Sequence, residues 1–221
     1  PNARWSNGDL VTAQDFIYSW TRLLSPATAS EYAYQGYYIK NGRDFNTGKI
    51  KDPLQLGARA VNPTTLEVTL ENPTPFFLGL LFHHALLPVH KATVERYGAR
   101  WTRSEYIVTN GPFSLEKWDM NKIITLKRSL TYWDKDRVKL ERVNFLPVDR
   151  VDTEEKMFRS KEIHITNEIP IEKISTWQRD STGVYRSYPY LGIYHYWLNT
   201  TKPPLNKKQV RKALAYAIDR E

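Results

Sequence analysis

An apolar stripe at helical spacing lies near the N-terminus of the chain. Phe16, Trp20 and Leu23 recur three or four positions apart, which places them on one face of a helix. Thr12 is a suitable N-cap and Pro26 a suitable stop, so a helix is expected between these two residues. Similar spacing predicts further helices over residues 92–97, 153–160, 170–177 and 207–221.

Strict alternation of apolar and polar residues marks the candidate strands. Residues 66–70 alternate in this way, which is typical of a strand with one buried face. Residues 112–118 and 123–128 are also strand-like, and the polar segment 119–122 between them predicts a β-hairpin. Further strand-like segments lie at 143–148, 162–166 and, with alternating aromatic residues, 185–198. Because helices and strands alternate along the chain, the pattern predicts an α/β layered fold.

Composition and charge narrow the class of protein. With 41% hydrophobic and 13% aromatic residues among 221, the chain can bury a core, and no apolar run approaches the roughly 18 residues of a membrane-spanning helix. There are 32 Lys and Arg against 24 Asp and Glu, a net charge of +8. These basic residues extend from Arg4 to Arg220 and are densest at Lys207, Lys208, Arg211 and Lys212. Such a spread favours a solvated surface over nucleic-acid binding.

The residue types that carry most catalytic and cofactor chemistry are either absent or do not occur in a recognised motif. The chain has no cysteine, which excludes disulfides, thiolate metal sites and a Cys nucleophile. No phosphate-binding glycine pattern and no zinc-ligand spacing occur, so neither a cofactor nor a metal is expected. The less favoured alternative is a metal site, which would require His83, His84 and His90 to come together in space. A Ser-His-Asp triad stays open on residue counts alone, but no nucleophile elbow marks one, and catalysis is not expected.

Both ends of the chain are expected to be cut. The chain opens at Pro1 without an initiator Met or a signal-peptide pattern. It closes on residues 213–221, which are helical in pattern and carry no stop signal. We therefore expect a piece of a longer protein, with an incomplete functional site.

Several stretches together resemble one family of binding proteins. The segment Trp5-Ser-Asn-Gly-Asp-Leu-Val-Thr-Ala-Gln-Asp-Phe16 matches the pattern W-S-[DN]-G-x-x-V-T-A-x-D-F. The similarity continues through residues 107–111, 132–134, 145–147 and 210–214. The chain is thereby similar to the family 5 extracytoplasmic solute-binding proteins of ABC importers, above all to members that bind oligopeptides and murein peptides. Those proteins are more than twice as long, so the resemblance implies an internal section.

The resemblance implies a type II periplasmic-binding-protein clamp with an additional small α/β domain, here incomplete. Residues 1–90 would form the accessory domain, 91–192 part of the first lobe, and 193–221 the hinge and the start of the last lobe. The implied function is to capture extended peptides in the periplasm, through main-chain hydrogen bonds like those of an added strand, and to deliver them to an inner-membrane ABC permease. The same resemblance implies a monomer without cofactor or catalysis.

The resemblance also implies which residues of this chain contact the ligand. Tyr32 lies where the oligopeptide binders place a cleft tyrosine, and Asn167 lies at a position expected to face the peptide. Tyr190, Tyr194 and His195 correspond to an aromatic segment at the cleft wall, where His195 replaces a tyrosine. A tyrosine offers a large apolar body and a polar handle, which suits a pocket that accepts varied ligands.

Two departures from the family pattern limit what this chain is expected to do alone. Gly192 stands where the oligopeptide binders carry a cysteine that forms a disulfide. The charged residues that would hold the peptide termini belong to the missing last lobe, so tight peptide binding by this chain alone is not expected. The alternatives are another solute within the family, such as a dipeptide, a murein peptide or a metal chelate, and, from other classes, a hydrolase or a nucleic-acid binder.

Overall fold

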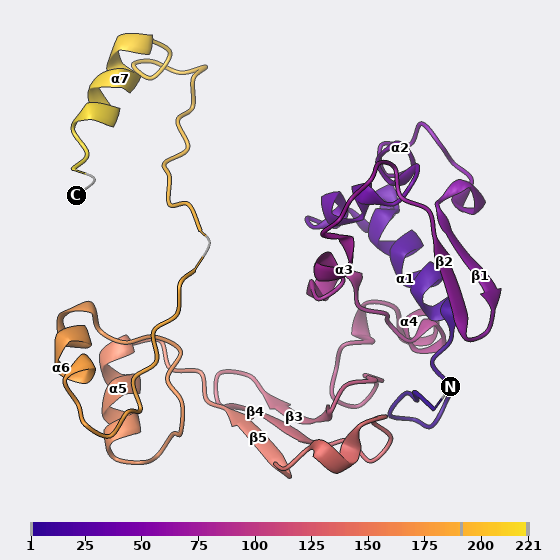
Figure 1. Ribbon diagram of the computed structural model, residues 1–221, viewed down its shortest axis with the longest axis horizontal. Helices are drawn as coiled ribbons and strands as arrows, with labels where there is room; N and C mark the ends of the chain where they lie inside the picture. Colours follow the sequence, from indigo (N-terminus) through magenta and orange to yellow (C-terminus); the bar gives the residue numbers. More distant parts are fainter. Residues whose placement is uncertain (1, 191, 220–221) are drawn as a thin grey trace. The chain divides into compact units, whose positions relative to one another are not determined.

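The structure is a computed structural model that describes residues 2–190 and 192–219 (Figure 1). The chain forms two compact units, Pro1–Asp149 and Arg150–Glu221, and each unit is described by itself. The first unit contains short helices and two antiparallel sheets, and the second contains helices joined by long irregular segments. The predicted α/β class is confirmed.

Helix α1 (Ala13–Leu24) begins at the predicted N-cap. The backbone N–H of Thr12 donates to Asp15 Oδ2 at 2.7 Å, which closes the first turn. The apolar stripe of α1 faces inward, and Trp20 is 2% exposed. Its indole Nε1 donates to the carbonyl of Leu86 at 2.9 Å, so the buried ring leaves no donor unpaired.

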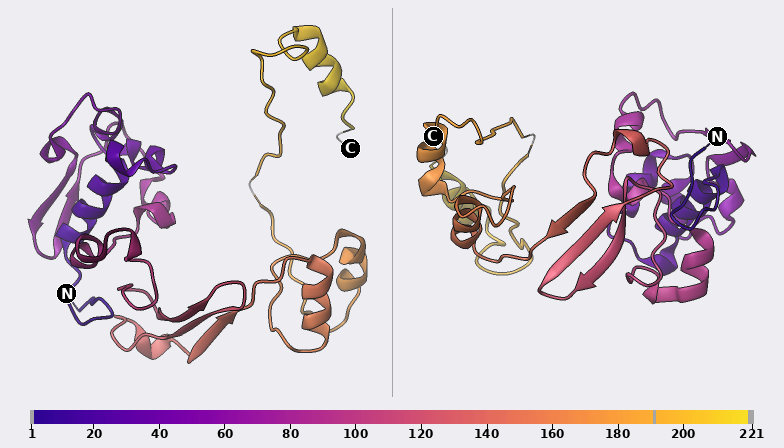
Figure 2. Two further views of the ribbon diagram at one scale, coloured as in Figure 1. Left: turned by 180° about the vertical axis from the view of Figure 1, so that it is seen from behind. Right: turned by 90° about the horizontal axis from the view of Figure 1, so that it is seen from below.

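The hairpin of β1 (Ala58–Asn62) and β2 (Thr65–Val68) lies against α1, as the two views of Figure 2 show. The alternation predicted over residues 66–70 is confirmed, because Leu66 and Val68 pack against the core that α1 forms. Glu67, between them, points away and is exposed. A helix on one face of a small sheet is thus the core of the first unit.

Short helical turns cover the segment between α1 and β1. They are η1 (Pro26–Thr28), η2 (Ala33–Tyr38), α2 (Gly42–Asn46) and η3 (Pro53–Gln55). Two glycines let these turns approach neighbouring backbone. A Cβ at Gly42 would lie 2.3 Å from the carbonyl oxygen of Gly36, and a Cβ at Gly57 would lie 2.3 Å from that of Thr69. Only a residue without a side chain fits at either position.

Four further short helices follow the hairpin: α3 (Phe77–Leu80), η4 (His84–Leu86), α4 (Lys91–Tyr97) and η5 (Gly98–Arg100). The helix predicted over residues 92–97 is confirmed as α4. It ends at Gly98, whose φ of +52° favours glycine.

The second sheet has the strand order β3-β4-β5 and is antiparallel throughout. Strands β3 (Phe113–Asp119) and β4 (Ile123–Arg128) form the predicted hairpin, and Asn121 takes a left-handed conformation in its turn, with φ of 57°. After η6 (Lys135–Arg137), strand β5 (Arg142–Phe145) pairs with β4. The third predicted strand is therefore confirmed, although it ends before residue 148.

The second unit contains the predicted helices. They are α5 (Val151–Arg159), η7 (Ile171–Lys173), α6 (Ile174–Gln178) and α7 (Lys208–Tyr216). Helix α7 ends at Tyr216, earlier than the predicted end at 221, and residues 220 and 221 lie outside the described residues. Among the helices of the described ranges, none combines the length and the apolar character needed to cross a membrane.

Two predicted strands of the second unit are wrong. Residues 162–166 form no strand, because the N–H of Glu162 donates back to the carbonyl of Met157 at 2.9 Å and turns the chain at the end of α5. The described residues of 185–198 are irregular and join no ladder. Alternation places side chains on two faces but does not supply a neighbouring strand to pair with.

Candidate functional site

Tyr32 lies in a cluster of four rings in the first unit, with Tyr34, His83 and His84. It precedes η2 and is 39% exposed. Its ring centroid is 5.2 Å from that of His83 and 4.9 Å from that of His84, and the two imidazoles stack on each other at 4.4 Å. Packing on two sides fixes the orientation of the tyrosine while part of its ring stays open to a ligand.

The hydrogen bonding of His83 sets its tautomer. Its Nδ1 accepts a hydrogen bond from the backbone N–H of Ala85 at 3.2 Å, at the start of η4. A neutral imidazole that accepts at Nδ1 carries its proton at Nε2, so the outer nitrogen of His83 is a donor and not a free metal ligand. The Nε2–H group of His83 therefore suits a hydrogen-bond acceptor such as a carbonyl or carboxylate oxygen.

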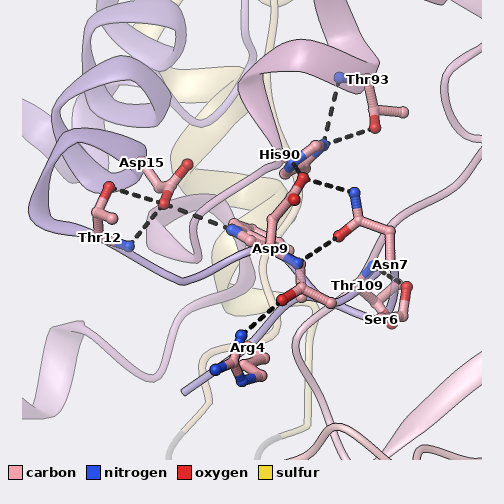
Figure 3. A network of polar contacts seen from close by, with 11 residues as sticks. Arg4, Ser6, Asn7, Asp9, Thr12, Asp15, His90, Thr93 and Thr109 are labelled. Atoms are coloured by element: carbon pink, nitrogen blue, oxygen red, sulfur yellow. Dashed lines mark hydrogen bonds and ion pairs between the residues drawn. The ribbon is translucent and has the colours of Figure 1, made fainter. Parts of the chain in front are cut away.

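The third histidine lies in a different network, drawn in Figure 3. His90 is 8% exposed, its Nδ1 accepts from the N–H of Thr93 at 3.3 Å, and its Nε2 lies 3.0 Å from Asp9 Oδ2. The alternative of three gathered histidines is thus wrong for His90. Among the described residues, no three His, Asp or Glu side chains come close enough to hold a metal ion.

The network around His90 ties together the segment that carries the family resemblance. The N–H of Ser6 donates to the Thr109 carbonyl at 2.7 Å, and the N–H of Thr109 donates to Ser6 Oγ at 3.2 Å (Figure 3). Trp5 is 1% exposed and contacts the His90 ring edge-on at 5.3 Å. The most specific motif of the sequence therefore holds the N-terminal segment, α4 and residue 109 together, which is a structural role.

In the second unit, Asn167 borders a hollow of about 610 Å³. The backbone N–H of Asn167 donates to Glu154 Oε1 at 2.7 Å, so the loop is fixed to α5 while the Asn167 side chain is exposed. Phe158, His164 and Trp177 line the same hollow. Aromatic walls with a few polar groups are typical of small-ligand pockets.

Two features of this hollow were not predicted from the sequence. The indole Nε1 of Trp177 is buried and finds no hydrogen-bond partner among the described residues, so an acceptor placed there would be stabilised. The guanidinium of Arg159 stacks over the same ring at 4.7 Å. No spacing signal links Trp177 to Asn167, because the segment that joins them changes from a loop to two short helices and has no single period.

The remaining predicted ligand-binding residues lie along the irregular segment of the second unit. Tyr190 is 92% exposed and Tyr194 is 89% exposed. His195 is exposed and contacts Trp197 edge-on at 5.0 Å. Four of the five predicted residues thus belong to the second unit and Tyr32 to the first, and all five are open to a ligand. Their role in binding stays a prediction.

Comparison with known proteins assigns the class to which this chain belongs. The model of the family described as "Bacterial extracellular solute-binding proteins, family 5 Middle" matches residues 1–221. The chain belongs to this family. The type II periplasmic-binding-protein fold predicted from the resemblance is also that of the solved relatives.

Individual relatives lie close in sequence and structure. The chain is 43% identical over 223 residues to the periplasmic oligopeptide-binding protein OppA of Salmonella typhimurium, covering 100% of this chain and 41% of that protein. The structure of the Escherichia coli murein tripeptide binding protein MppA matches with a TM-score of 0.93 and 37% identity, over 99% of this chain and 43% of that one. Listeria monocytogenes OppA bound to peptide matches with a TM-score of 0.69 and 39% identity, over 73% and 32%. This chain therefore spans about two fifths of the length of its relatives.

Proposed function

We propose that the protein containing this chain is the substrate-binding component of an ABC importer, which captures extended peptides in the periplasm and delivers them to an inner-membrane permease. The observation that supports this proposal most is the 43% identity to a periplasmic oligopeptide-binding protein along the whole chain. In this function the protein acts as a monomer, and it binds and releases its ligand without catalysis.

The five predicted residues would contact the peptide. Tyr32, Tyr190 and Tyr194 offer exposed rings with hydroxyl groups, and Asn167 and His195 offer exposed polar side chains. Main-chain hydrogen bonds give affinity without reading the peptide sequence, and ordered water bridges side chains of different size. Such a surface accepts many sequences.

The domain limits follow from the same proposal. Residues 1–90 would form the accessory domain, 91–192 part of the first lobe, and 193–221 the hinge and the start of the last lobe. A clamp of this kind completes its site only when both lobes meet the ligand.

Isothermal calorimetry of the full-length protein against a mixed pool of tri- to pentapeptides tests the proposal. We expect saturable binding, with the heat abolished when the pool is replaced by free amino acids. Absence of binding would favour a non-peptide solute of the same family. A shift of labelled DNA that weakens with added salt would instead support the nucleic-acid alternative, and turnover of a chromogenic ester would support a hydrolase.

A further inference from the structure

A second hollow of about 670 Å³ lies in the first unit, where η2, α2 and the loop after β2 meet. We call it the tyrosine groove. Tyr34, Tyr38 and Phe76 form its aromatic wall, and Arg43, Glu71 and Asn72 are its main polar groups. None of these six residues belongs to the peptide-contact set proposed above.

The aromatic wall of the tyrosine groove is open. Tyr34 is 52% exposed and Phe76 is 57% exposed. Tyr38 contacts Phe76 edge-on, with centroids 5.3 Å apart and planes at 87°, so the two rings form a corner. The face of an aromatic ring carries negative potential and attracts polarised C–H groups, so this corner suits a saturated ring rich in C–H bonds.

One polar group of the groove, the Glu71 carboxylate, is held in place before any ligand arrives. The backbone N–H of Asn41 donates to Glu71 Oε2 at 2.8 Å, and the N–H of Glu71 donates to the Tyr38 carbonyl at 2.9 Å. These bonds join the three segments that form the groove. A preorganised site loses less entropy on binding than a mobile one.

The unpaired groups of the groove include both hydrogen-bond donors and hydrogen-bond acceptors. The guanidinium of Arg43 and the side-chain amide of Asn72 make no hydrogen bond or ion pair with the described residues, and Glu71 keeps a second oxygen, Oε1, as an acceptor. Asp44 also lines the groove, but its charge is paired with Lys49 at 3.1 Å. The positive charge of Arg43 and the negative charge of Glu71 then cancel in the net charge of the groove, so the groove favours a neutral ligand over a charged one.

We propose that the tyrosine groove binds a neutral carbohydrate. Pyranose rings present C–H faces for the aromatic corner and adjacent hydroxyls for planar groups such as Arg43, Glu71 and Asn72. A peptide fits less well, because recognition of peptide backbone by strand addition needs an open strand edge. The groove is lined by helical turns and a loop, and β2 ends at Val68 before the loop begins.

Saturation-transfer NMR and calorimetry of the full-length protein test this proposal, with maltose, cellobiose and diacetylchitobiose as probes. We expect at least one of these disaccharides to bind. Phe76→Ala and Arg43→Gln should each weaken that binding by about tenfold, while peptide binding stays unchanged. Leu78→Ala, on the neighbouring helix α3 and 75% exposed, is the matched control and should change neither affinity.

Three results would overturn the proposal. One is that none of the disaccharides binds at up to about 10 mM. Another is that a disaccharide binds but both groove variants bind it as the unchanged protein does. A third is that the groove variants weaken binding of trialanine and not of the sugars. Thermal unfolding of each variant shows whether it is folded, and Arg43→Gln keeps the test valid if Phe76→Ala does not fold, because Arg43 is exposed and unpaired.

Discussion

At the scale of single residues, Tyr32 combines a fixed orientation with an exposed ring. Its contacts with His83 and His84 hold the ring but leave part of it open to solvent, since 39% of the residue is exposed. Loss of this side chain should therefore affect a ligand more than the fold.

We expect Tyr32→Ala in the full-length protein to weaken peptide binding by about tenfold, as loss of an aromatic anchor does. The melting temperature should change little. Calorimetry with one tripeptide measures the dissociation constant, and Tyr38→Ala, a tyrosine of η2 that lines the tyrosine groove and contacts Phe76, is the control with unchanged peptide affinity. An unchanged dissociation constant in Tyr32→Ala would remove Tyr32 from the site.

Glu155 is a buried carboxylate that bonds to two basic side chains. It is 2% exposed and accepts hydrogen bonds from Arg159 Nε at 2.5 Å and Lys173 Nζ at 2.9 Å. Burial raises the pKa of this carboxyl, but the two hydrogen bonds and the two positive charges outweigh burial and hold the pKa below its ordinary value. The charged form therefore stabilises the fold above the unfolded-state pKa of about 4.3, and this stabilisation is lost as the pH falls through the folded-state pKa.

We expect Glu155→Gln to lower the free energy of unfolding by about 1–3 kcal/mol at neutral pH. The difference from the unchanged protein should narrow as the pH falls below the unfolded-state pKa of about 4.3 and through the lowered folded-state pKa, because Glu155 itself becomes protonated. Urea unfolding followed by circular dichroism at several pH values measures both effects. Glu172→Gln, an exposed carboxylate on η7, should show neither. A difference that does not vary with pH would contradict the assigned role.

At the scale of elements, the start of α1 depends on one carboxylate. Asp15 Oδ2 accepts from the N–H of Thr12 at 2.7 Å and from the indole Nε1 of Trp5 at 3.4 Å. Asp15→Ala should lower the free energy of unfolding by about 1–2 kcal/mol, because it removes the first-turn bond and frees the Trp5 donor. Thermal unfolding measures the change, and Gln14→Ala, an exposed position in the same turn, should be nearly neutral. Equal effects of the two substitutions would contradict a capping role.

The elements that could be predicted from the sequence are those with local signals. Helix α1 has a cap, a stripe and a stop within its own residues, and the β3–β4 hairpin has its turn between adjacent strands. The strand expected over residues 162–166 is wrong because pairing is not local, and the backbone there bonds to the preceding helix. The same limit applies to the candidate site. Tyr32 could be named as a candidate from its motif, but its ring partners His83 and His84 come from a distant segment that no period connects to it.

At the scale of the whole molecule, the second unit leaves several large aromatic side chains exposed. Tyr190, Tyr194 and Trp197 are each at least 89% exposed. Surface of this kind is usually covered by a ligand or by another part of the protein. The relatives, which are more than twice as long as this chain, contain such further parts.

We therefore expect the 221-residue chain to bind the peptide pool at least about 100-fold more weakly than the full-length protein, which corresponds to about 3 kcal/mol of missing contacts. Calorimetry of the two proteins side by side measures the difference, with circular dichroism to confirm that the shorter chain is folded. Equal affinities would mean that the complete site lies within these residues.

The close backbone approach at Gly57 has a consequence for mutational tolerance. Its N–H and carbonyl both bond to neighbouring backbone, at Lys40 and Thr69, and the space that a methyl group would need is filled by the Thr69 carbonyl. In a saturation library selected for growth on peptides, even alanine should be depleted at this position. A Cβ added at Gly79 would meet no atom beyond its own helix within 4 Å, so this position should accept many residues. Two glycines of the same unit would thus differ in how freely evolution can replace them.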